Sequence, residues 1–140
     1  MRIMPGAMLG VVGGGQLGRM FVMAAQQMGY PVTVLDPSVD SPAGRIAEHF
    51  ICADYADHSA LKALSMQCAA ITTEFENIPA ESLRLLALSS VVSPDADSVS
   101  IAQNRVSEKQ FLGTNGFAVA PYAIIERHAD LTAQDIVDLL

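Results

Sequence analysis

Apolar residues along the chain form short runs that alternate with stretches of helical spacing. The run at residues 8–12 is bounded by glycines, which is typical of a strand buried on both faces of a parallel sheet. From residue 17 to residue 28 the apolar positions recur every three or four residues, which predicts an amphipathic helix that ends at Gly29. A second apolar run follows at residues 32–35. This order of strand, glycine turn, helix and strand predicts a right-handed βαβ unit.

The same alternation continues to residue 92 and predicts an α/β fold with a doubly wound parallel sheet. Sheets of this kind have the strand order 3-2-1-4-5, in which the first and fourth strands are neighbours where the winding reverses. A further helix is expected to begin at Pro79, because proline is tolerated in the first turn of a helix. The remaining elements are predicted as strands at residues 49–52, 69–73 and 91–92 and a helix at residues 58–67.

The composition of the sequence changes near Ser93, from apolar runs to turn-forming and polar residues. The segment Ser-Pro-Asp-Ala-Asp offers turn and helix-cap chemistry, and polar helical sequence runs from there to Thr114. We therefore expect one domain at residues 1–95, followed at residues 96–140 by linker helices and the beginning of a second domain. Within this second part the pattern predicts a turn at Asn115 and Gly116, a strand at 122–126 and an amphipathic helix at 131–140.

Composition narrows the class of protein. The 140 residues are 51% hydrophobic and carry a net charge of -7, which opposes binding to nucleic acid or to anionic membranes. No apolar run approaches the roughly 20 residues of a membrane-spanning helix, and we expect a cytoplasmic protein. Cys52 and Cys68 form no CxxC pair and are expected to be buried. The three histidines show no ligating spacing, so no metal site is expected.

Gly13, Gly15 and Gly18 form a G-x-G-x-x-G pattern between the first predicted strand and helix. Glycines permit positive φ and let an anion approach backbone N–H groups, and the helix dipole favours phosphate. Because no Gly-Lys-Ser/Thr follows, this is not a Walker A loop. The pattern predicts phosphate binding; the simpler interpretation is a tight turn between strand and helix.

Acidic residues follow the second and fourth predicted strands. Asp36 follows the glycines at nearly the separation, roughly 20 residues, that is expected of a ribose-binding acid in an NAD site. Asp36-Pro37 is equally typical of a turn at the end of a strand. Glu74 should converge with the glycine turn, because the first and fourth strands are neighbours. Carboxylates beside a phosphate loop make sense where they recognise a donor on the same ligand, such as an amine or a ribose hydroxyl. Glu76 is equally consistent with a helix cap or a solvated residue.

Three segments together carry a family resemblance: Gly-Gly-Gly-Gln-Leu-Gly-Arg-Met at 13–20, Thr-Glu-Phe-Glu-Asn-Ile at 73–78 and Ile-Ala-Gln-Asn-Arg-Val-Ser-Glu-Lys-Gln-Phe-Leu at 101–112. In this order and spacing they resemble the N5-carboxyaminoimidazole ribonucleotide synthetases, also called the ATPase subunit of phosphoribosylaminoimidazole carboxylase, which are ATP-grasp ligases of purine biosynthesis. The resemblance runs from residue 8 to about 125 and covers roughly the first third of such an enzyme. The sibling glycinamide ribonucleotide transformylases share the glycine turn and paired glutamates, but Gln16 favours the first family.

The resemblance implies a Rossmann-like pre-ATP-grasp domain followed by the start of an ATP-grasp domain. In that family ATP, Mg²⁺ and bicarbonate give carboxyphosphate, and its carbon dioxide is captured by the amine of aminoimidazole ribonucleotide on the way to IMP. The matching turn would hold the phosphate end of the ribonucleotide, and the glutamates would contact its polar groups. The matching positions are Gly15, Gln16, Leu17, Glu74 and, more weakly, Glu76 for the ribonucleotide, and Arg105 for ATP.

The same resemblance places the family's ATP-binding lysines, glycine-rich flap and magnesium carboxylates further along than Leu140. We therefore expect no catalytic residue, no tightly bound cofactor and no ligase activity in these residues alone, and a homodimer for the complete enzyme. An alternative is an NAD-binding Rossmann module of an oxidoreductase or regulatory sensor, which leaves Glu74 and Arg105 unexplained. A non-catalytic interaction domain is a third possibility that no residue supports.

Overall fold

The computed structural model describes residues 2–122 and 124, and its chain divides into two compact units between Gln103 and Asn104. The first unit includes helix α4 (Ala96–Gln103), so it extends beyond the boundary predicted at residues 95 and 96, which stays a prediction. The strand predicted at 122–126 and the helix predicted at 131–140 lie outside the described residues, apart from Tyr122 and Ile124.

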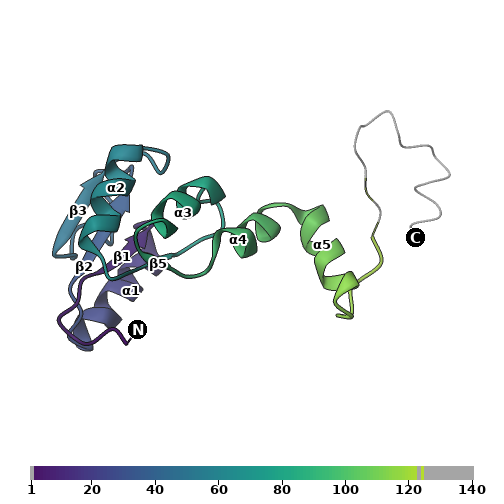
Figure 1. Ribbon diagram of the computed structural model, residues 1–140, viewed down its shortest axis with the longest axis horizontal. Coiled ribbons are helices and arrows are strands. Elements are labelled where there is room, and N and C mark those ends of the chain that lie inside the picture. The colour runs from purple at the N-terminus through teal and green to yellow at the C-terminus, as the bar shows by residue number, and fades with distance from the viewer. Residues whose placement is uncertain (1, 123, 125–140) are drawn as a thin grey trace. The chain divides into compact units, whose positions relative to one another are not determined.

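The first unit is built on a five-stranded parallel sheet in the order β3-β2-β1-β4-β5 (Figure 1). The predicted strand order is therefore confirmed, and the predicted ends of these elements are displaced by at most one residue. The strands are β1 (Leu9–Val12), β2 (Val32–Asp36), β3 (His49–Cys52), β4 (Ala70–Thr73) and β5 (Val91–Val92), and the helices before α4 are α1 (Gln16–Gln27), α2 (His58–Gln67) and α3 (Ala80–Ala87).

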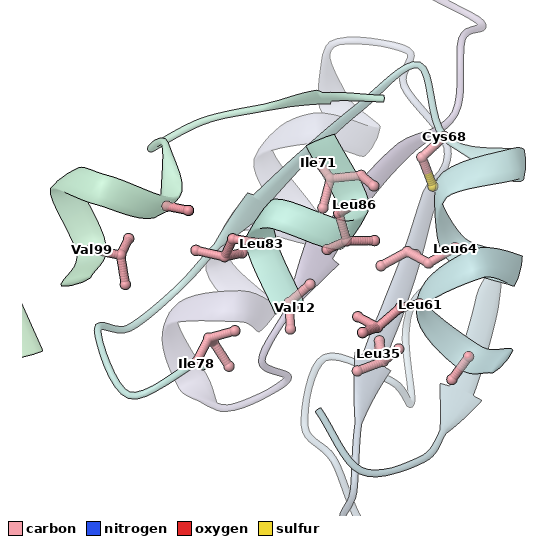
Figure 2. Packing of buried hydrophobic residues seen from close by; sticks show 12 residues of the cluster. Val12, Leu35, Leu61, Leu64, Cys68, Ile71, Ile78, Leu83, Leu86 and Val99 are labelled. Carbon is pink, nitrogen blue, oxygen red and sulfur yellow. The ribbon is translucent and has the colours of Figure 1, made fainter. Parts of the chain in front are cut away.

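The central strand β1 supplies side chains to two separate cores, because successive residues of a strand face opposite sides of the sheet. Val12 packs with Leu35 and with the leucines of α2 and α3, as Figure 2 shows. Val11 packs with Val34 on the other side, together with buried residues of α1. All four of these side chains are fully buried, and burial of each stabilises the fold by about 1.5–3 kcal/mol. The sheet is thus covered by helices on both faces, as predicted.

Local signals explain where α1 ends and why one cysteine prediction fails. Gly29 has a φ of +82° directly after the C-cap residue of α1, which confirms the predicted helix end. Cys68 is buried as predicted, but Cys52 is exposed, so that prediction is wrong. Cys52 is the last residue of β3, which has a neighbouring strand on one side only. An edge strand leaves part of its surface to solvent, which the apolar run alone did not reveal.

The second unit contains α5 (Arg105–Thr114). The side chain of Asn104 caps this helix by accepting hydrogen bonds from the amides of Val106 and Ser107 at 3.0 Å each. The helix ends in a turn in which Gly116 has a φ of +79°, which confirms the predicted turn. Among the described residues, no helix is both long and apolar enough to cross a membrane.

Candidate functional site

The glycine turn joins the carboxyl end of β1 to α1 and leaves no room for side chains. Gly13 has a φ of +100°, a conformation that favours glycine. A Cβ at Gly18 would lie 2.6 Å from the carbonyl oxygen of Gly13, and a Cβ at Gly15 would lie 2.8 Å from a carboxylate oxygen of Glu74. The glycines are therefore required by the turn itself and by the close approach of Glu74.

Glu74 follows β4 and reaches the glycine turn on the neighbouring strand. Its Oε1 accepts a hydrogen bond from the amide of Gly15 at 2.7 Å, and its Oε2 accepts one from the amide of Gly18. These are two of the four amides at the start of α1 that have no carbonyl partner within the helix. A carboxylate is also favoured at this positive end of the helix dipole. The predicted convergence of Glu74 with the turn is confirmed. The anion that binds the amides of Gly15 and Gly18 is the carboxylate of this side chain.

Two further amides at the start of α1 have no acceptor within the helix. The first hydrogen bond of the helix joins the amide of Arg19 to the carbonyl of Gly15, so helical geometry provides no partner for the amides of Gln16 and Leu17. Both residues are exposed. The turn therefore combines a carboxylate acceptor, Glu74, with two backbone donors beside it.

Asp36 contacts the turn from β2, the other neighbour of β1. Its Oδ2 accepts hydrogen bonds from the amide of Gly14 at 2.7 Å and from the hydroxyl of Tyr55 at 2.8 Å, and its Oδ1 accepts one from the amide of Ser38 at 2.8 Å. Only 8% of Asp36 is exposed. Burial of the phenol, together with its hydrogen bond to Asp36, raises the pKa of Tyr55 and keeps its hydroxyl protonated as a donor. The carboxylate of Asp36 is thus committed to groups within the protein.

The loop after β2 also closes over the turn. The hydroxyl of Ser41 and the amide of Ala43 both donate hydrogen bonds to the carbonyl oxygen of Gly14 at 2.9 Å. A Cβ at Gly14 would overlap the Ser41 hydroxyl. A ribose that used Asp36 in the manner of an NAD site would have to reach a carboxylate that is almost fully buried and already accepts three hydrogen bonds. Sequence reasoning missed both Tyr55 and Ser41, because neither belongs to a recognisable motif.

A cavity of about 370 Å³ lies beside Glu74. Glu76, which is exposed, lines the same cavity, so the two glutamates share one space. Glu76 does not cap the next helix, because the N-cap residue of α3 is Pro79 and makes no side-chain cap. The other lining residues come from β4 and its loop and from the segment around α4: Thr73, Phe75, Pro94, Ser98, Val99 and Ala102.

Arg105, the candidate for ATP, is the first residue of α5 and lies in the second unit. Its guanidinium pairs with the carboxylate of Glu108, and its side chain is 72% exposed. Over the described part of the chain, no group of three or more His, Cys, Asp or Glu side chains could hold a metal ion.

A comparison with known protein families assigns the first unit to a family. A family model described as the ribonucleotide synthetase preATP-grasp domain matches residues 6–103. The chain belongs to this family. The match ends at Gln103, where the first compact unit also ends, so the pre-ATP-grasp domain is a structural unit of this chain. The predicted pre-ATP-grasp fold is confirmed, and the NAD-binding alternative is not favoured.

Relatives of this chain include enzymes of much greater length. The N5-carboxyaminoimidazole ribonucleotide synthase of Staphylococcus aureus strain COL is 42% identical over 126 residues, which are 90% of this chain and 34% of that protein. The enzyme of the same name from Bacillus subtilis strain 168 is 42% identical over 129 residues, or 92% and 34% of the two chains. The chain thus spans about a third of the length of the curated relatives that it matches.

Solved structures give the same result. The N5-carboxyaminoimidazole synthetase of Staphylococcus aureus complexed with ADP superimposes with a TM-score of 0.87 at 39% identity, covering 97% of this chain and 37% of that one. The synthase of Aspergillus clavatus, in complex with ADP and 5-aminoimidazole ribonucleotide, superimposes with a TM-score of 0.75 at 31% identity, covering 82% and 31%. The pre-ATP-grasp domain described above is therefore similar to the corresponding part of enzymes solved with ADP, one of them also with a ribonucleotide.

Proposed function

We propose that this chain is the ribonucleotide-binding part of an ATP-dependent carbon–nitrogen ligase. The complete enzyme would carboxylate 5-aminoimidazole ribonucleotide with bicarbonate to N5-carboxyaminoimidazole ribonucleotide in the biosynthesis of IMP. The observation that supports this most directly is the carboxylate of Glu74, which is fixed by the amides of Gly15 and Gly18 and lies beside a cavity. The names of the relatives and the ribonucleotide in the Aspergillus clavatus structure support the choice of substrate.

The two kinds of group at the turn suit the two ends of such a ligand. Each oxygen of Glu74 has capacity for a further hydrogen bond and can accept from a ribose hydroxyl or an amine of the ribonucleotide. The amides of Gln16 and Leu17, together with the dipole of α1, favour the phosphate end. Glu76 lines the same cavity and can accept from a second donor on the ligand. Donor and acceptor groups would then fix the orientation of the ribonucleotide.

The contribution of these residues to the reaction is positioning. In the proposed reaction bicarbonate attacks the γ-phosphorus of ATP and gives ADP and carboxyphosphate, which releases carbon dioxide and phosphate. The amine of the ribonucleotide then attacks carbon dioxide and loses a proton. Phosphoryl transfer depends mainly on positioning and charge neutralisation. Glu74 would hold the amine-bearing substrate in place, and the guanidinium of Arg105 would contact ATP.

Further parts of the proposal concern the complete enzyme. We assign ATP and Mg²⁺ to it, and we assign none of the described residues to the metal, because no cluster of ligands is present among them. We also propose that the complete enzyme is a cytoplasmic homodimer, and that residues 1–140 alone bind no cofactor tightly and have no ligase activity. We keep the predicted division, with the pre-ATP-grasp domain at residues 1–95 and with linker helices and the beginning of the ATP-grasp domain at residues 96–140, while the family match extends to residue 103.

A calorimetric titration of the 140-residue chain tests this proposal. We expect saturable binding of 5-aminoimidazole ribonucleotide and no comparable binding of NADH, because Asp36 is committed to Gly14, Ser38 and Tyr55. Adenosine monophosphate serves as the control ligand, since it carries the same ribose phosphate on a different base. Tight NADH binding without a response to 5-aminoimidazole ribonucleotide would contradict the proposed function.

A further inference from the structure

The loop that follows β4 carries Glu74 and Glu76 but has no regular structure of its own. Its beginning is fixed to the central strand, because the hydroxyl of Thr73 and the amide of Glu74 both contact the carbonyl oxygen of Val12, at 3.2 and 3.3 Å. Its end is fixed by Ile78, which is fully buried in the core. Between these two points, the hydroxyl of Thr73 also lies 3.1 Å from the carbonyl oxygen of Phe75, and the carbonyls of Glu76 and Ile78 lie beyond its reach.

Gln103, the last residue of α4, supplies that partner from a distant part of the sequence. Its side-chain nitrogen lies 2.6 Å from the carbonyl oxygen of Glu76 and 2.5 Å from that of Ile78. A side-chain amide has two N–H groups, so Gln103 can donate one hydrogen bond to each carbonyl. The amide thus bridges two residues of the loop across more than 20 positions of sequence.

The helix that carries Gln103 is itself anchored. Ala96 and Val99 of α4 are buried in the same core cluster as Ile78, with 9% and 5% of their surfaces exposed. The loop that carries the glutamates is also packed through its own Phe75, whose ring makes an edge contact with the ring of Tyr55 at 5.9 Å between centroids. Gln103 therefore joins the glutamate-bearing loop to a support that belongs to the packed core.

We propose that Gln103 is a positioning residue for Glu74. By holding the carbonyls of Glu76 and Ile78, it fixes the loop so that the carboxylate of Glu74 stays on the amides of Gly15 and Gly18. The consequence for ligand affinity rests on the function proposed above, whereas the effect on the Glu74 carboxylate does not. Gln103 acts through the loop and makes no direct contact with the carboxylate that it positions.

Substitution of Gln103 by Glu tests the amide with little change of shape. Gln103→Glu places a carboxylate against two carbonyl oxygens, and Gln103→Met removes the donors without adding charge. Gln67→Glu is the matched control, because Gln67 is the exposed last residue of α2 and the change adds the same charge at the same position of a helix. Any effect of the helix dipole is therefore common to Gln67→Glu and Gln103→Glu.

Amide hydrogen exchange measured by NMR on the 140-residue chain gives a readout without ligand. We expect the amides of Gly15 and Gly18 to exchange about tenfold faster in Gln103→Glu and Gln103→Met, since the loop loses two hydrogen bonds. In both Gln103 variants, the amides that pair β1 with β2 should exchange at the same rate as in the unsubstituted chain. In Gln67→Glu, every amide should do so. Unchanged exchange at Gly15 and Gly18 would overturn the proposal, and so would equal acceleration across the sheet, which would mean general destabilisation.

Titration with 5-aminoimidazole ribonucleotide separates this proposal from the function. We expect the dissociation constant to rise about tenfold in Gln103→Glu and to stay unchanged in Gln67→Glu. If the unsubstituted chain binds no ribonucleotide while Gly15 and Gly18 still exchange faster in Gln103→Glu, the proposed function fails and the positioning of Glu74 is supported. If the exchange changes and the affinity of a binding-competent chain does not, the role of Gln103 in ligand positioning is overturned.

Discussion

Two carboxylates flank the central strand of the sheet and have different surroundings. Asp36 ends β2 and Glu74 follows β4, and both strands pair with β1. Each carboxylate accepts hydrogen bonds from amides of the glycine turn. Asp36 is almost fully buried and is also bound by Ser38 and Tyr55, whereas Glu74 is partly exposed beside a cavity.

The comparison shows that position in the fold does not by itself give a residue its role. On the β2 side the carboxylate is almost fully buried and accepts hydrogen bonds from Gly14, Ser38 and Tyr55, which fixes the shape of the turn. On the β4 side the corresponding residue, Glu74, is partly exposed and lines a cavity of about 370 Å³. The acidic residue with NAD-like spacing is therefore the structural one, and the less familiar glutamate is the candidate for a ligand. Three experiments can test this distinction.

Asp36→Ala should have the largest effect on stability. It leaves the amides of Gly14 and Ser38 and the hydroxyl of Tyr55 without their acceptor, and we expect the free energy of unfolding to fall by about 3 kcal/mol. Urea denaturation followed by circular dichroism measures this loss. Asp40→Ala is the control, because Asp40 is an exposed partner of Arg45 and should contribute less than about 1 kcal/mol. Equal losses for the two variants would contradict the structural role of Asp36.

Gly18→Ala should have an intermediate effect, on the Glu74 side of the comparison. The added Cβ would lie 2.6 Å from the carbonyl oxygen of Gly13 and 2.8 Å from Glu74 Oε2, so we expect a loss of about 2 kcal/mol and weaker binding of ribonucleotide. Gly113→Ala, in α5, is the control, because a Cβ there meets nothing within 4 Å. Alanine should raise helix stability at Gly113. A stabilised Gly18→Ala variant in urea denaturation would show that the close approach of Glu74 is not required.

Glu74→Gln should have the smallest effect on stability and a selective effect on ligands. We expect a loss of about 1 kcal/mol in unfolding, since one of two hydrogen bonds from the turn is lost, but at least tenfold weaker use of ribonucleotide. In the complete enzyme the Michaelis constant for ATP should stay nearly unchanged. Arg105→Ala should do the reverse, raising the Michaelis constant for ATP and leaving that for ribonucleotide. Equal effects of both variants on both substrates would contradict the assignment.

Much of the fold could be predicted because its signals are local. The apolar run of β1, the helical spacing of α1 and the glycine at residue 29 each act within one element, and the predicted ends agree with the structure to one residue. The exposed Cys52 shows where this approach fails. A short apolar run predicts a strand but does not say that the strand lies at the edge of the sheet with one end in solvent.

The candidate site was predictable only in part. The topology rule for doubly wound sheets places the ends of β1 and β4 side by side, and from this the approach of Glu74 to the glycine turn followed. The contacts of Tyr55 with Asp36 and of Ser41 with Gly14 did not follow, and neither did the two hydrogen bonds from Gln103. They join residues 19 or more positions apart through loops without repeating pattern. Gln103 lies within a segment that carried the family resemblance, yet nothing in that segment indicated its side-chain contacts.

The sequence by itself determined the order of strands and helices, the glycine turn and the family to which the chain belongs. The spacing of apolar residues, and the glycines and prolines at the ends of helices and strands, act over a few residues. These features can therefore be recognised without coordinates. Only the tertiary structure decided which carboxylate is buried and which is partly exposed, because this depends on the side chains that loops bring from elsewhere. Asp36 meets Tyr55 and is closed off, whereas Glu74 meets two amides and a cavity, and that difference separates a structural acid from a candidate ligand-binding one.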